Sequence, residues 1–367
     1  MSASGLTAVA MSGGVDSSLA AALLAREGRS LVGFSMQLVD RLAGEDERYG
    51  RCCSPDDFRD ARAVADRLGV PHYVLHMEEE FRRHVLEPFH VDYARARTPS
   101  PCVRCNTFLK FGELLSRGRM VGAERVATGH YAILEHDAAA GRTLLRRAAD
   151  EEKDQSYFLF DLSEEQRRAA EFPLGRMRKE EVRQAARALG LATADKSESQ
   201  DLCFVPSGGN YRDFLGVRGL APGGGAGEIV DSAGAVLGRH DGISAFTVGQ
   251  RRGIGVASGR RLYVLRIEET TRRVVVGEER ELLREECTIE RTRWIPFERL
   301  SGSLRAVVRI RSQHAGVGAT LAATGDGCAR VRFDEPQRAV TPGQALVAYD
   351  GGLVLGGGWI AATGTEV

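Results

Sequence analysis

The heptapeptide SGGVDSS, residues 12–18, links a short apolar run at residues 6–11 to an Ala- and Leu-rich segment at residues 15–26. The run has the length of a buried strand, and the segment has the composition of a helix. Two glycines in the linking heptapeptide let its backbone turn sharply and approach a ligand closely. The N–H groups and dipole at the start of a helix favour a phosphate. The sequence therefore predicts a strand–loop–helix unit that binds a phosphorylated ligand.

Strand-like and helix-like segments alternate through the first half of the chain. Apolar runs at residues 31–38, 72–76 and 125–128 have the size of buried strands, and residues 56–68 predict a helix that ends at Gly69. This alternation is typical of a mainly parallel sheet with helices on both faces. We therefore expect an α/β fold for this part of the chain.

The second half is rich in glycine, and short apolar runs alternate there with turns, which predicts small β domains. The expected strands lie at residues 228–230, 245–248, 263–267, 304–310, 329–333, 345–349 and 354–360. The predicted division is a catalytic α/β domain at residues 1–205, a small β-rich central domain at 206–282 and a C-terminal β-barrel at 283–367.

The composition is that of an ordinary globular protein, with 43% hydrophobic and 27% charged residues. No apolar run is long enough to span a bilayer and no secretion signal is evident, so we expect a cytoplasmic protein. The formal net charge is zero, yet residues 239–273 hold eight arginines against three acidic residues, and residues 291–311 hold six against one. Such clusters are either solvated strand faces or contacts for an anionic partner. Lysine is rare and occurs only at residues 110, 153, 179 and 196.

The stretch TPSPCVRCN, residues 98–106, is the second informative segment. Its prolines keep the chain extended and place a helix start at Pro101, with Ser100 as the N-cap. Cys102 and Cys105, three residues apart, would then share one face of the first turns, where the positive helix end favours the nucleophilic thiolate. The helical spacing continues through Phe108, Phe111 and Leu115.

Seven cysteines in a chain without a secretion signal argue against a disulfide framework. The CxxC pair could be half of a zinc site, although no second pair of ligands appears, or a redox pair, although no thioredoxin-like context surrounds it. Buried inert thiols are a third possibility and the favoured one for Cys287 and Cys328. Cys203 follows the polar loop at residues 197–201, and no chemistry is expected of Cys52 and Cys53.

The heptapeptide matches the SGGxDS loop of the ATP pyrophosphatases, or PP-loop enzymes, which cleave ATP to AMP and pyrophosphate. It is not the usual P-loop, because no lysine follows its glycines. Over nearly its whole length the chain resembles the tRNA-uridine 2-sulfurtransferases, also called tRNA-specific 2-thiouridylases (the MnmA/TrmU family). The matching motifs are AMSGGVDSS at residues 10–18, GFSM at 33–36, PCVRCN at 101–106, ATGHY at 127–131, KDQSYFL at 153–159, SQDLCF at 199–204, TVGQRRG at 247–253 and GGGWI at 356–360.

This resemblance implies 2-thiolation of the wobble uridine, position 34, of the tRNAs for lysine, glutamate and glutamine. ATP, with Mg²⁺, would adenylate the C2 oxygen, and a sulfur nucleophile would then displace AMP. The implied ATP-binding residues are Ala10, Met11, Ser12, Gly13, Gly14, Val15, Asp16, Ser17, Met36 and Gly129, with Asp16 as a candidate magnesium ligand. The residues implied to contact tRNA are Lys153, Asp154, Gln155, Arg311 and Ser312.

The resemblance also implies the route of the sulfur. Cys203 would carry a persulfide received from a donor protein, a cysteine desulfurase or a relay, and Cys105 would release the sulfur through a transient disulfide with Cys203. Many family members have aspartate where this chain has Cys102. Cys102, Cys105 and Cys203 could therefore hold a [4Fe–4S] cluster that binds free sulfide instead.

Two other functions remain open. One is a different PP-loop enzyme, such as a thiolase for another base or an amide-forming ligase, although a ligase needs no thiols. The other is a non-catalytic RNA-binding protein that retains the ATP fold. We expect neither a membrane nor a DNA partner.

Overall fold

The computed structural model describes residues 5–39, 54–197, 202–205, 225–257, 259–325 and 327–363. The chain divides into two compact units. The first unit comprises Met1–Val85, Cys102–Phe214 and Gly352–Val354, and the second comprises Leu86–Pro101, Leu215–Gly351 and Leu355–Val367. The domain boundaries expected near residues 205 and 282 stay predictions. Among the described helices, none has the length and apolar character that a membrane span requires.

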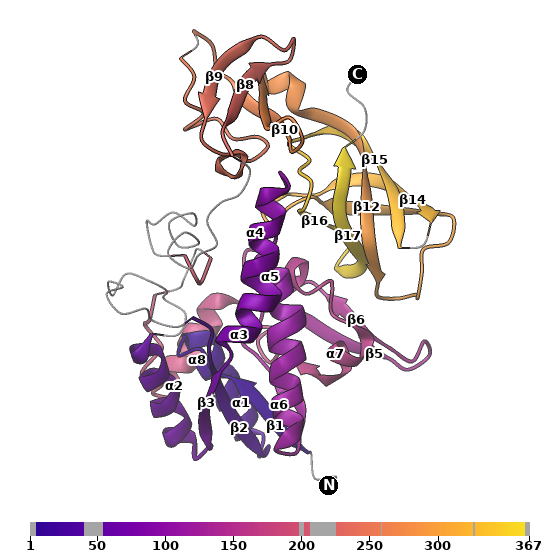
Figure 1. Ribbon diagram of the computed structural model, residues 1–367. Coiled ribbons are helices and arrows are strands. Elements are labelled where there is room, and N and C mark those ends of the chain that lie inside the picture. The colour runs from indigo at the N-terminus through magenta and orange to yellow at the C-terminus, as the bar shows by residue number, and fades with distance from the viewer. Residues whose placement is uncertain are drawn as a thin grey trace. The chain divides into compact units, whose positions relative to one another are not determined.

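A five-stranded parallel sheet forms the centre of the first unit (Figure 1). Its order is β3-β2-β1-β4-β7, with β1 at Leu6–Ala10, β2 at Leu31–Gln37, β3 at His72–His76, β4 at Ala123–Ala127 and β7 at Ala170–Glu171. The chain adds β2 and β3 on one side of β1 and then returns to add β4 on the other. Doubly wound sheets bind ligands at such a change of direction, outside the carboxyl ends of the strands. The predicted α/β class is confirmed.

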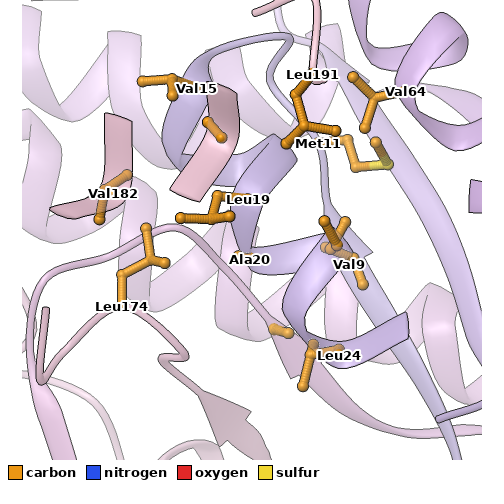
Figure 2. Packing of buried hydrophobic residues seen from close by; sticks show 14 of the residues in the cluster. Val9, Met11, Val15, Leu19, Ala20, Leu24, Val64, Leu174, Val182 and Leu191 are labelled. Atoms are coloured by element: carbon orange, nitrogen blue, oxygen red, sulfur yellow. The ribbon is translucent and has the colours of Figure 1, made fainter. Parts of the chain in front are cut away.

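Helix α1 (Val15–Arg26) begins directly after the glycine loop, as the sequence predicts. Helix α2 (Pro55–Leu68) has a capping box at its start and ends at Gly69, whose φ of 67° suits glycine. Helix α1 is apolar on most sides because it packs against the sheet, α2 and α8 (Lys179–Ala188). Figure 2 shows this core, whose labelled members include Val9 from β1, Leu19 from α1, Val64 from α2 and Val182 from α8.

Further helical segments lie between β3 and β7 along the chain, and α4 among them belongs to the second unit. They are α3 (Glu78–Phe81), the π-helix η1 (Arg82–Leu86), α4 (Glu87–Ala94), α5 (Pro101–Arg104), the π-helix η2 (Cys105–Glu113), α6 (Leu114–Met120), the 3₁₀ turn η3 (Ser156–Phe158) and α7 (Glu164–Ala169). Helix α5 starts at Pro101, as predicted. A hairpin of β5 (Ile133–Asp137) and β6 (Arg142–Arg146) completes the first unit and pairs with Leu353.

The second unit contains a four-stranded sheet with the order β10-β11-β8-β9. Its strands are β8 (Gly227–Asp231), β9 (Val236–His240), β10 (Tyr263–Glu268) and β11 (Arg273–Gly277). The strand expected at residues 245–248 is wrong. A 3₁₀ turn, η4 (Ile243–Ala245), occupies part of this segment, and Gln250 N donates to Thr247 O in the next turn. The turns place the Phe246 side chain in the core of this sheet. The apolar residues of the segment are therefore explained by burial and not by strand pairing.

Six strands of the C-terminal part form a closed barrel with the order β12-β15-β14-β13-β16-β17, because β17 also pairs with β12. They are β12 (Leu283–Trp294), β13 (Ser303–Arg309), β14 (Val317–Gly325), β15 (Cys328–Arg338), β16 (Ala345–Asp350) and β17 (Leu353–Thr363), and the turn η5 (Glu279–Leu282) precedes them. The predicted barrel is confirmed. Burial raises the pKa of Cys287 in β12 to about 12, which supports its interpretation as an inert thiol.

Candidate functional site

The loop at residues 12–18 leaves the carboxyl end of β1, and its own side chains hold its shape. Ser17 Oγ accepts a hydrogen bond from Ser12 N at 3.1 Å and donates to Gly14 O at 3.1 Å. Gly13 has φ 72°, and a Cβ atom there would lie 2.2 Å from Asp57 O. Glycine is therefore required at this position, both for its backbone angle and for its contact with α2.

The loop after β4 forms a second wall of the site. A Cβ atom on Gly129 would lie 2.7 Å from the carbonyl carbon of Asp16 and 2.8 Å from Ser17 N. Glycine thus lets this loop touch the N-terminus of α1, at the change of direction between β1 and β4. Ala10 and Met36, both partly buried, lie at the carboxyl ends of β1 and β2. The expected ATP-binding residues therefore gather at one edge of the sheet.

Two apolar residues of that set, like Ser17, have buried side chains. Met11 and Val15 are 2% and 3% exposed and belong to the core of Figure 2. Ser35 Oγ donates to Met11 O at 2.7 Å, which fixes the backbone where the loop begins. We conclude that Met11 and Val15 shape the site through the core and through their backbone.

Asp16 has an ionic partner from a distant helix. Lys179, the first residue of α8, donates from Nζ to both carboxylate oxygens of Asp16, at 2.7 and 2.8 Å. Tyr131 donates its hydroxyl to Asp16 Oδ1 at 2.7 Å, and Lys179 Nζ lies 5.6 Å from the centre of the Tyr131 ring. The Lys179 side chain is only 12% exposed. Each oxygen of Asp16 thus has a hydrogen-bonding partner, and its role as a magnesium ligand stays a prediction.

A second lysine ties the loop to α2. Lys196 donates from Nζ to Gly13 O at 3.1 Å, to Asp57 Oδ1 at 2.7 Å and to Asp60 Oδ2 at 2.5 Å. Partial burial lowers the pKa of Lys196, but the hydrogen bonds to Asp57 and Asp60 outweigh it and raise that pKa above its usual value. Lys196 therefore remains a cation that holds the loop backbone in place.

The cysteines of the CxxC motif differ in environment. Cys102 is exposed and Cys105 is buried, and the expectation that they share one helix face stays a prediction. Helix α5 ends at Arg104 and a π-helix begins at Cys105. A π-helical turn contains more residues than an α-helical one, so the α-helical spacing expected after Cys105 is not kept. The same change leaves Phe108 36% exposed, whereas Phe111 and Leu115 are buried.

Hydrogen bonds to other parts of the first unit hold the π-helix. Gln166 Nε2 donates to Thr107 O at 2.7 Å, and Asn106 Nδ2 donates to Phe158 O at 3.1 Å. Such outside partners compensate for the altered backbone hydrogen bonding that a π-helix entails. A π-helix is often found at a functional site, which agrees with the position of Cys105 at its start.

Cys203 is partly buried in the short described segment at residues 202–205. Its neighbour Phe204 packs edge-on against Phe81 of α3, with 5.7 Å between ring centres, and α3 packs against the π-helix. The Cys203 segment and the Cys105 helix thus share α3 as a neighbour. In the described part of the chain, no three His, Cys, Asp or Glu side chains lie close enough to hold a metal ion. This arrangement therefore does not fit a cluster on Cys102, Cys105 and Cys203.

His130 is a site residue that our sequence reasoning missed, although it lies in the ATGHY motif. Its Nδ1 is 2.7 Å from Thr128 Oγ1 and its Nε2 is 3.4 Å from Lys110 Nζ. Burial, followed by the charge of Lys110, lowers the pKa of His130 well below its usual value. The imidazole is therefore neutral, and Nε2 is its acceptor nitrogen because an ammonium group can only donate. Lys110 thereby connects the π-helix to the loop that contains Gly129.

The turn at residues 153–155 is bound to the same loop. Gln155 Oε1 accepts from Tyr131 N at 2.9 Å, and Gln155 N donates to Tyr131 O at 2.8 Å. The Asp154 carboxylate is 1% exposed and accepts from Ser156 N at 3.1 Å and from Arg147 Nε at 3.2 Å, so it has a structural role inside the turn. Lys153 is partly buried.

Two features of the second unit suit an anionic partner. Arg311, which is exposed, and Ser312 lie in the turn between β13 and β14. Arg251, Arg260 and Arg261 line a pocket of about 530 Å³ together with Gly253, Ile254, Gly255, Val256, Ala257 and Leu262. All three arginines are exposed, and Arg260 Nη1 lies 3.4 Å from Glu278 Oε1.

Comparison with known proteins identifies the family. Three family models match successive parts of the chain: the tRNA methyl transferase HUP domain at residues 6–207, the tRNA methyl transferase PRC-barrel domain at 217–278 and the aminomethyltransferase beta-barrel domain at 284–360. The tRNA-specific 2-thiouridylase MnmA of Solibacter usitatus is 50% identical over 365 residues, which cover 96% of this chain and 98% of that protein. The proteins of the same name from Koribacter versatilis and Acidobacterium capsulatum are each 48% identical, over 370 and 374 residues, and the alignments cover 98% of this chain and 100% of theirs. The chain therefore belongs to the tRNA-specific 2-thiouridylase family, as its motifs indicated.

Proposed function

We propose that this chain uses ATP to replace the C2 oxygen of the wobble uridine of tRNA with sulfur. The observation that supports it most is the meeting of the SGGVDSS loop and Gly129 at the carboxyl edge of the parallel sheet, within a unit that also contains Cys105 and Cys203. The relatives named tRNA-specific 2-thiouridylase agree with this chemistry.

The first step is adenylation of the base. The C2 oxygen of uridine attacks the α-phosphorus of ATP, a new O–P bond forms, and pyrophosphate leaves. The loop N–H groups and the N-terminus of α1 favour the negative charge of the phosphates. The AMP group turns the C2 oxygen into a good leaving group, which prepares C2 for a sulfur nucleophile.

The second step is sulfur transfer. The terminal sulfur of a Cys203 persulfide attacks C2, and AMP leaves with the former C2 oxygen. The Cys105 thiolate then attacks Cys203 Sγ, which breaks the sulfur–sulfur bond of the persulfide and leaves the terminal sulfur on the base. The product disulfide between Cys105 and Cys203 requires two electrons from a thiol reductant before the next turnover. A persulfide-bearing protein must then reload Cys203.

The alternative routes need different groups. A [4Fe–4S] cluster would bind free sulfide and would need Cys102, Cys105 and Cys203 together, which the present arrangement of thiols does not provide. Magnesium would arrive with the phosphates of ATP, beside the Asp16 carboxylate that Lys179 contacts. We therefore assign both steps to the chain's own residues.

Exposed arginines suit the tRNA backbone. In the second unit, Arg311 and the pocket of Arg251, Arg260 and Arg261 would hold phosphates without reading sequence, and in the first unit Lys153 would do the same. The target base must leave its stack to reach an active site, as it does in other base-modifying enzymes. Such binding weakens as salt increases, because each phosphate contact releases about one counterion.

The test is incubation of the purified protein with ATP, magnesium, unmodified glutamate tRNA, a persulfide donor and a thiol reductant, followed by mass spectrometry of the digested nucleosides. We expect 2-thiouridine at position 34 and tRNA-dependent release of pyrophosphate. Methyluridine in place of thiouridine would contradict the proposal. It would indicate a tRNA methyl transferase, the activity for which two of the matching domains are named. Tight tRNA binding without either product would indicate a binding protein.

Two cysteine variants separate the sulfur routes in this assay. Cys203→Ser should lose thiolation completely and keep its affinity for tRNA. Cys102→Ser should retain thiolation with the persulfide donor, because the exposed Cys102 has no step in that route. Product formation that depends on Cys102, bound iron and free sulfide would replace the persulfide route by the cluster route.

A further inference from the structure

We propose that Lys179 binds the β- and γ-phosphates of ATP and the pyrophosphate that leaves. This inference rests on the proposed use of ATP and adds to it the cation that the loop lacks. In the usual P-loop, a lysine directly follows the glycines and reaches the β- and γ-phosphates. Here Val15 and Asp16 follow the glycines, and the lysine comes from α8, 163 positions further along the chain.

The position of Lys179 suits this role. Its Nζ atom lies on Asp16, the second residue of α1, next to the helix N-terminus that faces the loop. Its side chain is 12% exposed, so its charge is only partly screened by water. Its backbone is fixed as well, because Lys179 N donates to Asp150 Oδ2 at 2.9 Å. A cation held in this way is already in place when the nucleotide enters.

The partners of Lys179 allow it to change contacts. Asp16 engages Nζ with both carboxylate oxygens and also accepts from Tyr131. An ammonium group has three donor hydrogens, so it can keep one bond to Asp16 and direct the others to phosphate oxygens. The Tyr131 hydroxyl then continues to hold Asp16. Lysine suits such a task because it is a compact point charge on a flexible stem.

A purely structural role makes a different prediction. If Lys179 served only to neutralise Asp16, its loss would leave one uncompensated carboxylate beside the phosphates, and removing that carboxylate as well would restore binding. If Lys179 contacts the phosphates, the double variant Asp16→Asn/Lys179→Met binds ATP and pyrophosphate more weakly than the single variant Asp16→Asn, whereas a purely neutralising Lys179 makes these two variants equal. The comparison of the single and double variants therefore separates the two roles.

The experiment measures binding of ATP, AMP and inorganic pyrophosphate to the full chain by titration calorimetry. For Lys179→Met we expect affinity for ATP and pyrophosphate to fall roughly tenfold to a hundredfold, the loss of one or two charge-assisted hydrogen bonds. Affinity for AMP should stay within about twofold, because AMP lacks the phosphates concerned. Lys179→Arg should recover part of the loss, since it keeps the charge.

Three outcomes would overturn the proposal. The first is Lys179→Met protein that binds ATP and pyrophosphate as tightly as the unaltered protein. The second is an equal loss for AMP, which would indicate a general collapse of the site. The third is equal binding of ATP and pyrophosphate by the double variant and by Asp16→Asn. Failure of the unaltered protein to bind ATP or pyrophosphate would overturn the proposed function together with this inference, whereas the first three outcomes leave the proposed function intact.

Discussion

The phosphate loop at residues 12–18 and the cysteine helix at residues 101–113 were both identified from short motifs, but they fold by different rules. The loop follows its local sequence, with a glycine at φ 72° and a helix that starts directly after it. The cysteine helix departs from its local sequence after one turn and continues as a π-helix. Its Cys105 is buried and its Cys102 is exposed, so the two thiols differ in their access to solvent.

The contrast shows what short motifs determine. Glycines and caps act through the dihedral angles of a few neighbouring residues, so their effect can be predicted locally. A π-helix depends on partners elsewhere, here Gln166 and Phe158. Motif spacing therefore predicts the conformation of the loop but does not predict the burial of the two thiols.

The largest expected effect comes from the buried thiol of the cysteine helix. Cys105→Ser should abolish the formation of 2-thiouridine, because no thiolate then cleaves the sulfur–sulfur bond that still joins the base to Cys203. Pyrophosphate release in the presence of tRNA should persist, since adenylation precedes this step. Nucleoside mass spectrometry and a pyrophosphate assay on the same samples measure both quantities.

The matched control is Cys328→Ser, a partly buried cysteine of β15 outside the first unit, which should thiolate normally. Normal thiolation by Cys105→Ser would remove Cys105 from the sulfur route. The π-helix that begins at Cys105 would then have no part in sulfur transfer.

An intermediate effect on stability and on ATP binding is expected from Lys196, which joins the loop to α2. Lys196→Met leaves Asp57 and Asp60 without their shared cation and Gly13 O without its donor. We expect the free energy of unfolding to fall by roughly 1 to 3 kcal/mol, between the values for exposed and buried ion pairs. ATP affinity should fall as well, because the loop loses its tie to α2. Denaturant unfolding and ATP titration measure the two effects.

The control for this experiment is Arg59→Met, which removes an exposed ion pair with Asp56 on the same helix. It should change neither quantity appreciably. Equal losses in Arg59→Met and Lys196→Met would mean that α2 is generally sensitive and that Lys196 has no special part in the loop.

The smallest expected effect is a change in the pH dependence of stability. It concerns His130, which contacts Lys110 of the cysteine helix. The pKa of His130 is lowered in the folded protein, so the unfolded chain binds a proton at a pH where the folded one does not. Stability should therefore be retained above about pH 6.5, the ordinary histidine value, and should decrease as the pH falls below it. In His130→Gln, the part of this loss of stability that comes from protonation of His130 should be absent. Unfolding free energies measured between about pH 5 and about pH 8 test this, and identical slopes in both proteins would contradict it.

Much of the fold could be predicted, because parallel strands, helix caps and barrel strands leave periodic or compositional patterns. Helix α1 and the Gly69 end of α2 are examples. The partners of Asp16 could not be predicted, because Lys179 meets it through the tertiary fold and no local pattern records that contact. Lysine is rare in this chain, yet Lys110, Lys179 and Lys196 all contact the site, a signal from which no site was predicted. The turn at residues 243–250 was mistaken for a strand because buried turns and buried strands have similar apolar composition.

Strand β17 has a consequence for the biosynthesis of this protein. Its first residues belong to the first unit, where Leu353 pairs with Arg146, and its later residues close the barrel against β12. Domains emerging from the ribosome usually fold in order, N-terminal first. Here neither unit has all its strand pairings until residues 353–363 have been translated. A nascent chain that stalls earlier exposes the open edge of β12 and the edge of the β5–β6 hairpin, the kind of unpaired strand edge that promotes aggregation and recruits chaperones.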